Sequence, residues 1–239
     1  MRISPQCLAM GAVRPQWNIL TLPESKFATQ AREQKSMVDR RWALRAGLAI
    51  TGASLAGTAG AAELAPTPSQ PEGPFYPTTK PARLSADLTQ GHGEKDARGE
   101  RLALGGRVLA RDGSPLAGVM VEIWQADYQG IYHHTGDDRH LDVDPGFAGY
   151  GEVKTGAAGE FALQTIVPAP YTGRPPHIHV RLVRDDTAVL TTQLYIKDHP
   201  ANEKQGFFSS LIFSNTDKLL MQLQPGSASG KAAQFDLVV

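Results

Sequence analysis

The 239-residue chain contains one cysteine, Cys7. A single thiol excludes a disulfide framework and a thiolate metal site within one chain, so any metal would need His, Tyr, Asp or Glu ligands. Such ligands favour a harder ion than copper(I) or an iron–sulfur cluster. An excess of charge is also missing, because 24 Lys and Arg residues balance 24 Asp and Glu residues. Overall charge therefore gives no reason to expect nucleic acid or an acidic membrane as a partner.

Helical periodicity is scarce after residue 65, whereas turn residues are dense and no internal repeat is evident. Short segments rich in β-branched and aromatic residues, bounded by such turns, are typical of strands. The predicted strands are 102–110, 119–124, 161–166, 177–183, 189–196 and 235–239, with a hairpin turn at 185–186 and one short helix at 217–223. This pattern predicts an all-β fold, a β-sandwich with long loops.

The N-terminal quarter has a different character. Arg40 and Arg41 precede an apolar run of small residues, 46–62, which ends with the cleavage pattern Ala59-Gly60-Ala61. This order resembles a twin-arginine export signal, and the alternative is an Ala-rich helix packed on the body. The run is too short and too rich in Gly and Ala to predict a spanning helix.

Three segments are therefore expected. Residues 1–36 fit no pattern and are expected to be disordered or untranslated, with Met37 as the natural start. Residues 37–62 form the signal, and residues 63–239 form one β-sandwich domain. The protein is expected to be exported to the periplasm without stable membrane insertion once the signal is removed, or to stay cytoplasmic if the interpretation of the signal is wrong.

The hexapeptide Arg174-Pro175-Pro176-His177-Ile178-His179 predicts half of a metal site. Side chains alternate along a strand, so His177 and His179 would share one face. The prolines fix the approach to the strand, and Arg174 adds a permanent cation. Two histidines leave the site incomplete, and the remaining candidate ligands are the other five histidines, the tyrosines and the acids.

Ordinary roles are the commoner alternatives for each residue alone. A His-x-His pair is more often a pair of surface or core histidines, Arg174 an ion-pair residue, and Tyr171 a core residue. The Pro-rich segment 66–81 could be a plain linker, but Phe75 and Tyr76 predict that it packs against the body.

Several stretches together resemble the intradiol ring-cleavage dioxygenases, non-haem iron(III) enzymes that open catechol rings. They span about residues 66–239 in order, and the hexapeptide matches the histidine signature of the family closely. The stretches are Thr67-Pro68-Ser69-Gln70-Pro71-Glu72-Gly73-Pro74-Phe75-Tyr76, Trp124-Gln125-Ala126-Asp127 through Gly130-Ile131-Tyr132, Phe161 through Tyr171, the hexapeptide, and Thr192-Gln193-Leu194-Tyr195.

The resemblance implies iron(III) held by Tyr132, Tyr171, His177 and His179. It also implies that Tyr171 takes a substrate proton, that Arg174 contacts substrate and stabilises negative charge, and that Gln193 lies near the substrate. Asp127 and Glu160 are then structural. The β-sandwich would carry long loops around this metal site.

The implied reaction cleaves a catechol-type ring between its two hydroxylated carbons with O2, giving a muconate-type diacid. The partners are the aromatic substrate and O2, without nucleic acid, and a homo-oligomer or a hetero-oligomer with a homologous chain is possible. Two other functions stay open: another β-sandwich metalloenzyme that uses the His-x-His pair, and a secreted non-enzymatic binding module.

The signal can be tested by replacing Arg40 and Arg41 together with lysine. We expect the precursor to accumulate in the cytoplasm, whereas the unchanged protein is exported with a mature N-terminus near Ala62. Cell fractionation and N-terminal sequencing measure both. Arg184→Lys, in the predicted domain downstream of the signal, is the control, and an exported protein that begins near Met1 would contradict the prediction.

Overall fold

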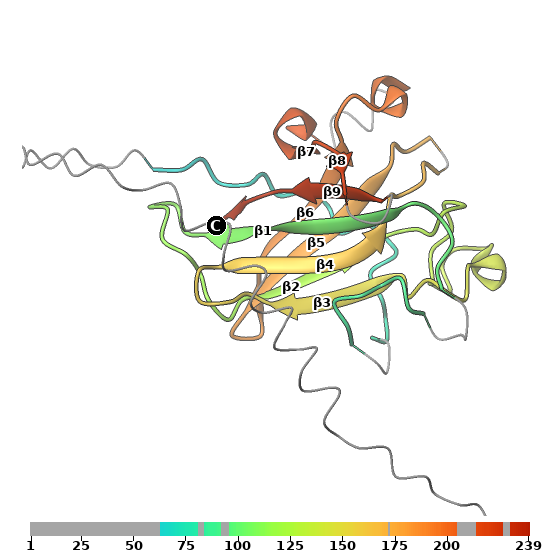
Figure 1. Cartoon of the computed structure of the whole chain (residues 1–239), viewed down its shortest axis with the longest axis horizontal. Coiled ribbons are helices and arrows are strands. Elements are labelled where there is room, and N and C mark those ends of the chain that lie inside the picture. The colour runs from blue at the N-terminus through green and yellow to red at the C-terminus, as the bar shows by residue number, and fades with distance from the viewer. Residues whose placement is uncertain (1–62, 81–83, 92–95, 172, 205–213, 227–229) are drawn as a thin grey trace, which may run out of the picture. The chain divides into compact units, whose positions relative to one another are not determined.

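The computed structural model describes residues 63–80, 84–91, 96–171, 173–204, 214–226 and 230–239 (Figure 1). The predicted leader and export signal, residues 1–62, lie outside this part of the chain. Among the described residues, no helix has the length and apolar character needed to cross a membrane.

Ten strands and three short 3-10 helices make up the described fold. The strands are β1 Arg101–Leu109, β2 Met120–Trp124, β3 Tyr150–Lys154, β4 Glu160–Ile166, β5 His177–Arg184, β6 Thr187–Ile196, β7 Leu220–Met221, β8 Gln224–Pro225, β9 Lys231–Gln234 and β10 Leu237–Val238. The 3-10 helices are η1 His140–Asp142, η2 Pro200–Lys204 and η3 Thr216–Leu219. The chain is therefore mostly β, as the sequence predicted.

The first sheet is built around β1. Strand β4 pairs with one edge of β1 in antiparallel fashion, while β9 and β10 follow each other along the other edge, both parallel to β1. Strand β8 pairs with β9. Two strands from residues 231–238 therefore pair along this edge of β1.

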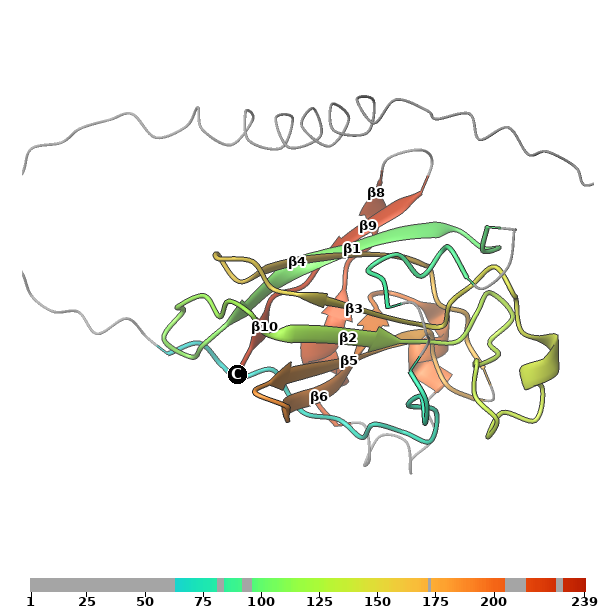
Figure 2. The same ribbon diagram turned by 90° about the horizontal axis from the view of Figure 1, so that it is seen from below.

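The second sheet has the order β3-β2-β5-β6-β7. Strands β5 and β6 form the predicted hairpin, whose turn residues Asp185 and Asp186 have φ values of 49° and 58°. Two consecutive residues of positive φ suit the twist of a two-residue hairpin. Figure 2 shows β1 and β4 of the first sheet in one layer and β2, β5 and β6 of the second sheet in another.

The main core lies between the two sheets. Alternate residues of β2 and β5, such as Val121, Ile123, Ile178 and Val180, face residues of β1 and β4 in one apolar cluster. Their neighbours, by alternation, face the other side of the second sheet. That outer face is also covered, which is why Glu122 is only 3% exposed rather than facing solvent as in a half-buried strand.

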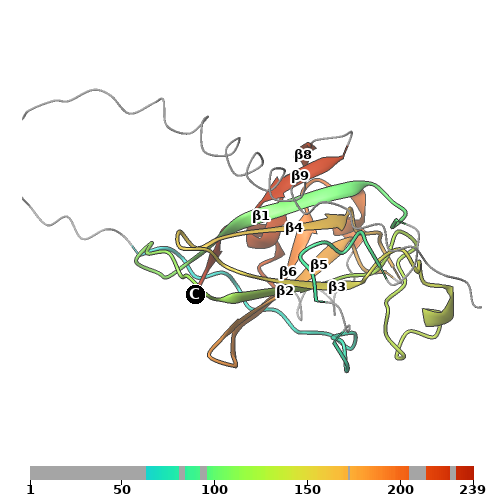
Figure 3. The same cartoon turned by 60° about the horizontal axis from the view of Figure 1, so that its bottom comes forward.

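The cover of the outer face comes from two segments. We call residues 66–77 the strap; it follows strand β6, with a backbone hydrogen bond from Gln70 to Thr191 O of 2.9 Å. The second cover is the loop 125–149, which leaves the end of β2 (Figure 3). The prediction that the Pro-rich segment packs against the body is confirmed.

Several local predictions need correction. Residues 217–223 were expected to be helical, but η3 ends at Leu219 and β7 follows it. Strands β3, β8 and β9 were not predicted, and the last strand is confined to Leu237–Val238. Residues 220–221 pair with the edge of β6, and this long-range pairing outweighs their local helical pattern.

Charged side chains under the strap form a partly buried network. Lys80 Nζ lies 2.6 Å from Glu122 Oε1 and 2.9 Å from Glu152 Oε2. Tyr76 donates to the other oxygen of Glu122, and Tyr150 donates to Glu152. The hydrogen bonds from Tyr150 and Lys80 hold the pKa of Glu152 below its ordinary value although burial opposes this.

Lys80→Met should lower the free energy of unfolding at pH 7 by about 1–3 kcal/mol, because Glu122 loses its cation while it stays buried. We place the cost below that of a fully buried pair because the Lys80 side chain is 40% exposed. Urea denaturation measures the change, with Lys197→Met, an exposed lysine, as the control. Because folding lowers the pKa of Glu152, the stabilisation that this carboxylate contributes is fully present above its unfolded pKa. That stabilisation is lost as the pH falls through its folded pKa. Equal stabilities of the two variants at pH 7 would contradict the prediction.

Candidate metal centre

The candidate site is built on the outer face of the second sheet. Strand β5 begins at His177, as predicted, and its alternation places His177 and His179 on the same side, with ring centroids 4.8 Å apart. Both histidines are 2% exposed. Pro175 and Pro176 cannot donate backbone hydrogen bonds, so the ladder starts where the histidines do.

Backbone contacts fix the tautomer of His177. Its Nδ1 lies 2.7 Å from the carbonyl oxygen of Pro175, so Nδ1 carries the proton and donates it. The lone pair of Nε2 therefore faces away from the backbone, and Tyr132 Oη lies 3.4 Å from it. A separation near 3 Å suits two ligand atoms that each lie about 2 Å from a shared metal.

His179 is held by aromatic stacking. The indole of Trp124 on the adjacent strand β2 lies parallel to its ring, with centroids 4.7 Å apart and planes inclined by 9°. His179 Nδ1 is buried and has no hydrogen-bond partner among the described residues. An imidazole nitrogen buried in this way costs free energy unless a bound species satisfies the ring. This cost indicates that the site binds a ligand or a metal ion.

The two tyrosines reach the histidines from different loops. Tyr132 lies in the loop after β2, and Tyr171 lies in the turn before β5; their ring centroids are 5.4 Å apart. Gly130 permits this approach, because a Cβ on it would lie 2.8 Å from Pro170 O and 2.9 Å from the Tyr171 Cβ. Its φ of +77° would also strain any other residue.

Tight local bonding supports both loops. Tyr171 and Arg174 exchange backbone hydrogen bonds of 2.7 and 3.3 Å across the turn that holds Gly173. Buried Asp137 accepts a hydrogen bond from the backbone nitrogen of Tyr132 and pairs with Arg139. Phe75 of the strap stacks on Tyr132 at 4.5 Å, so the strap helps to enclose the site.

Burial sets the protonation of all four side chains. It raises the pKa of Tyr132 well above its ordinary value, and Tyr171 adds to the rise. It also raises the pKa of Tyr171, against a hydrogen bond from Tyr132 and the charge of Arg174. Burial and then Arg174 lower the pKa of His177 to about 3, and burial lowers that of His179 well below its usual range. Without a bound cation the site thus holds two neutral phenols and two neutral imidazoles.

The donor set fits a strongly Lewis-acidic metal ion. Neutral imidazoles present lone pairs, and a phenol becomes a good ligand only when a cation removes its proton. No group of three or more His, Cys, Asp or Glu residues that could hold a metal occurs in the described part of the chain. The tyrosines are therefore essential to any four-ligand site here.

Arg174 lies beside this group in a hydrogen-bond network. Its Nη2 donates to Gln193 Oε1 at 2.7 Å and to Tyr195 Oη at 3.3 Å. Gln193 is fully buried, and its Nε2 donates to Pro71 O at 2.8 Å. Gln193 thus lies behind Arg174, so the contact with substrate predicted for it would be indirect.

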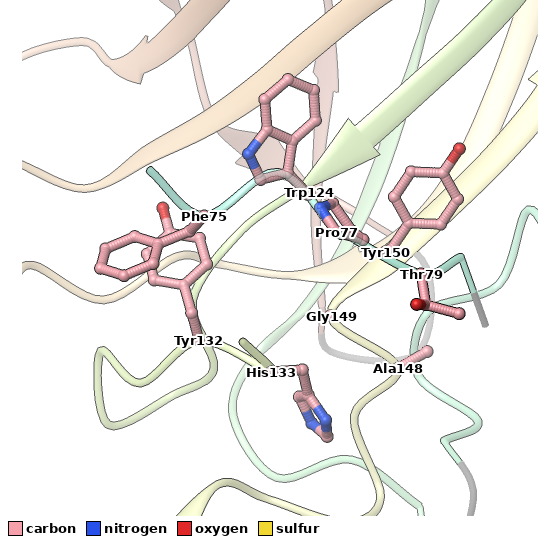
Figure 4. Close-up of a pocket in the computed structure, with 9 residues that line it drawn as sticks. All are labelled: Phe75, Pro77, Thr79, Trp124, Tyr132, His133, Ala148, Gly149 and Tyr150. Atoms are coloured by element: carbon pink, nitrogen blue, oxygen red, sulfur yellow. The ribbon is translucent and has the colours of Figure 1, made fainter. Parts of the chain in front are cut away.

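Two cavities have Phe75 as a shared lining residue. The larger, of about 550 Å³, is lined by Pro74, Phe75, Gly136, Asp137, Asp138, Arg139, Tyr171 and Arg174. The smaller, of about 160 Å³, is lined by Phe75, Pro77, Thr79, Trp124, Tyr132, His133, Ala148, Gly149 and Tyr150 (Figure 4). Only the larger cavity is lined by both Tyr171 and Arg174, so it is the candidate substrate site.

The other candidate ligands have structural roles instead. Asp127 accepts hydrogen bonds from the backbone nitrogens of Gln129, Ile131 and Asp144, and Glu160 accepts one from Ala158. The described histidines outside the site, His133, His134, His140 and His199, each bond to a nearby backbone group, and His92 lies outside the described residues.

Comparisons with known proteins give the family of this chain. The family model described as Dioxygenase matches residues 71–239, which is most of the chain. The protocatechuate 3,4-dioxygenase beta chain of Burkholderia cepacia is 32% identical over 180 residues, 70% of this chain and 76% of that protein. This protein is an intradiol ring-cleavage dioxygenase.

Solved structures support this membership of the intradiol dioxygenases. The dioxygenase domain of a dioxygenase–carbohydrate-binding protein fusion from Streptomyces sp. SirexAA-E is 36% identical, with a TM-score of 0.58, and covers 73% of this chain and 98% of that one. The 3-chlorocatechol 1,2-dioxygenase of Rhodococcus opacus 1CP is 26% identical, with a TM-score of 0.55 and coverage of 72% and 71%. The chain spans 52% of the length of the catechol 1,2-dioxygenase 2 of Acinetobacter lwoffii.

Family membership excludes one of the two alternative functions, the non-enzymatic binding module. The relatives are oxidoreductases, so the chain is an enzyme rather than a non-enzymatic binding module. Sequence reasoning missed Trp124, Phe75 and Tyr195 as parts of the site. Only their alternation with predicted core positions on strands, or their place in the Pro-rich segment, could have indicated them.

Proposed function

We propose that this enzyme binds iron(III) through Tyr132, Tyr171, His177 and His179. We propose further that it cleaves a catechol-type ring between its hydroxylated carbons, with both atoms of O2 entering the diacid product. The main support is the convergence of two phenols and two imidazoles, one of which, the phenol of Tyr171, lines a cavity of about 550 Å³. Bound iron(III) would supply Lewis acidity toward the phenols and the catechol, and the redox chemistry with O2.

The two tyrosines differ in exposure, and this suggests a division of roles. Tyr132 is 2% exposed and stacked under Phe75, whereas Tyr171 is partly exposed and lines the substrate cavity. A catechol that enters the cavity would meet Tyr171 first. We assign to Tyr171 the role of taking a substrate proton, while Tyr132 holds its place.

Arg174 would stabilise the negative charge that develops on the ring. A guanidinium keeps its charge when it is partly buried, and Arg174 is tied by Nη2 to Gln193 and Tyr195 while it lines the cavity. A cation fixed in advance need not reorganise during the reaction, which makes it effective in a site that excludes water.

The proposed catalysis needs only one chain. All four candidate ligands and Arg174 come from residues 132–179, and the strap that covers them belongs to the same chain. We therefore propose that the enzyme acts alone, as a homo-oligomer, or as the catalytic member beside a homologous chain. We also propose that it acts in the periplasm, on the strength of residues 37–62 alone.

An optical experiment tests the ligand set. The purified protein loaded with iron(III) should be burgundy-red, because tyrosinate-to-iron(III) charge transfer absorbs visible light. Tyr132→Phe and Tyr171→Phe should each shift this band, whereas Tyr128→Phe, which removes a hydroxyl bonded to Arg98, should leave it unchanged. A colourless protein with bound zinc would favour another metalloenzyme that uses the His-x-His pair.

Arg174→Ala should keep the colour but lower turnover on the order of 100-fold, because it removes a preorganised charge from the substrate cavity. Oxygen uptake with a panel of catechols measures the loss and also identifies the preferred substrate. Arg184→Ala, an exposed change at the far end of β5, is the control. Full turnover by Arg174→Ala would refute the assigned role.

A further inference from the structure

The strap follows strand β6 through a regular series of contacts (Figure 2). Thr192 Oγ1 donates to Pro68 O at 2.7 Å, the backbone nitrogen of Gln70 donates to Thr191 O, and Gln193 Nε2 donates to Pro71 O. Gln70 stands at the centre of the series and is only 6% exposed. It lies just before residue 71, where the match to the family model begins.

Both ends of the Gln70 amide are engaged. Its Nε2 donates to Ser214 O at 3.1 Å, and its Oε1 accepts a hydrogen bond from Tyr195 Oη at 2.8 Å. Ser214 O is a carbonyl oxygen and can only accept, so the NH2 end must face it. The amide therefore has one orientation, and that orientation offers an acceptor to Tyr195.

This acceptor decides where the single hydroxyl proton of Tyr195 points. Tyr195 Oη lies 2.8 Å from Gln70 Oε1, 3.2 Å from Gln193 Oε1 and 3.3 Å from Arg174 Nη2. Donation along the shortest contact, to Gln70, leaves the lone pairs of the hydroxyl for Arg174 Nη2. Donation to Gln193 instead would follow the longer contact of 3.2 Å, would place the Tyr195 hydroxyl and Arg174 Nη2 on one amide oxygen, and would take the hydroxyl hydrogen away from Gln70 Oε1.

We infer that Gln70 is a positioning residue that acts through Tyr195 on the guanidinium of Arg174. By accepting the hydrogen bond of the Tyr195 hydroxyl, Gln70 leaves Tyr195 and Gln193 both as acceptors for the two hydrogens of Arg174 Nη2. The guanidinium is then fixed from behind while Arg174 lines the substrate cavity. This inference rests on the proposed function in so far as Arg174 acts on substrate.

The test is a double-mutant cycle in the full-length, iron-loaded enzyme with catechol as substrate. Gln70→Met, which keeps the length of the side chain, and Tyr195→Phe should each lower kcat about tenfold, with little change in KM and no shift of the visible band. The double variant should lose no more than either single variant. Losses that multiply in the double variant would overturn the inference, as would a kcat unchanged by Gln70→Met.

Thr192→Val is the matched control, because it removes another side-chain bond between β6 and the strap without touching Tyr195. It should lower the urea midpoint about as much as Gln70→Met does and leave kcat unchanged. An equal loss of kcat in both variants would mean that loosening of the strap, and not the contact of Gln70 with Tyr195, is responsible.

Crystal structures separate failure of the inference from failure of the proposed function. In Gln70→Met, the contacts of Arg174 Nη2 to Gln193 and Tyr195 should lengthen or the guanidinium should turn. If the unchanged enzyme opens no catechol, the proposed function fails, yet this movement still tests the coupling. If the enzyme is active but Arg174 keeps its place in Gln70→Met, the inference alone is wrong.

Discussion

The burial of four neutral donor groups around one point is the constraint on which the rest of the structure depends. Two imidazoles and the phenol of Tyr132 lie out of water, the phenol of Tyr171 is partly buried, and a nitrogen of His179 lacks a protein partner among the described residues. Such groups cost free energy in isolation and become favourable when a cation takes up their lone pairs. The same burial holds the phenols protonated and the imidazoles neutral until a cation is bound.

Side chains on the outer face of a sheet are buried only if other segments cover them. Here one covering segment precedes β1 in the chain and the other follows β2. The strap arrives before the first strand and packs Phe75 on Tyr132, while the loop after β2 carries Tyr132 itself. The second sheet is therefore covered on both faces, one toward the main core and one toward the site. The strap has the Pro-rich sequence of a linker, yet it encloses one side of the site. It also supports Arg174 through the hydrogen bond between Pro71 and Gln193.

Local patterns predicted those elements whose pattern agrees with their tertiary environment. Strands β1, β2, β4, β5 and β6 were close to their observed bounds, because alternation and flanking turns coincide there. Strand β3 holds Gly151 against Leu88 and lacks a clear alternation. Strands β8 and β9 are short, and β9 is stabilised by pairing with β1, which is distant in sequence. The segment 220–221 pairs with β6 instead of extending a helix.

The sequence by itself determined the shared face of His177 and His179, because a strand alternates its side chains whatever lies around it. The family resemblance of the sequence identified Tyr132 and Tyr171 as candidate ligands, but no local rule brings these two residues to the same histidines. Only the tertiary structure decided that meeting, through the close contact at Gly130 and the shared burial under Phe75. It also decided that Gln193 stands behind Arg174, because Gln193 donates to Pro71 O of the strap while its amide oxygen accepts from Arg174.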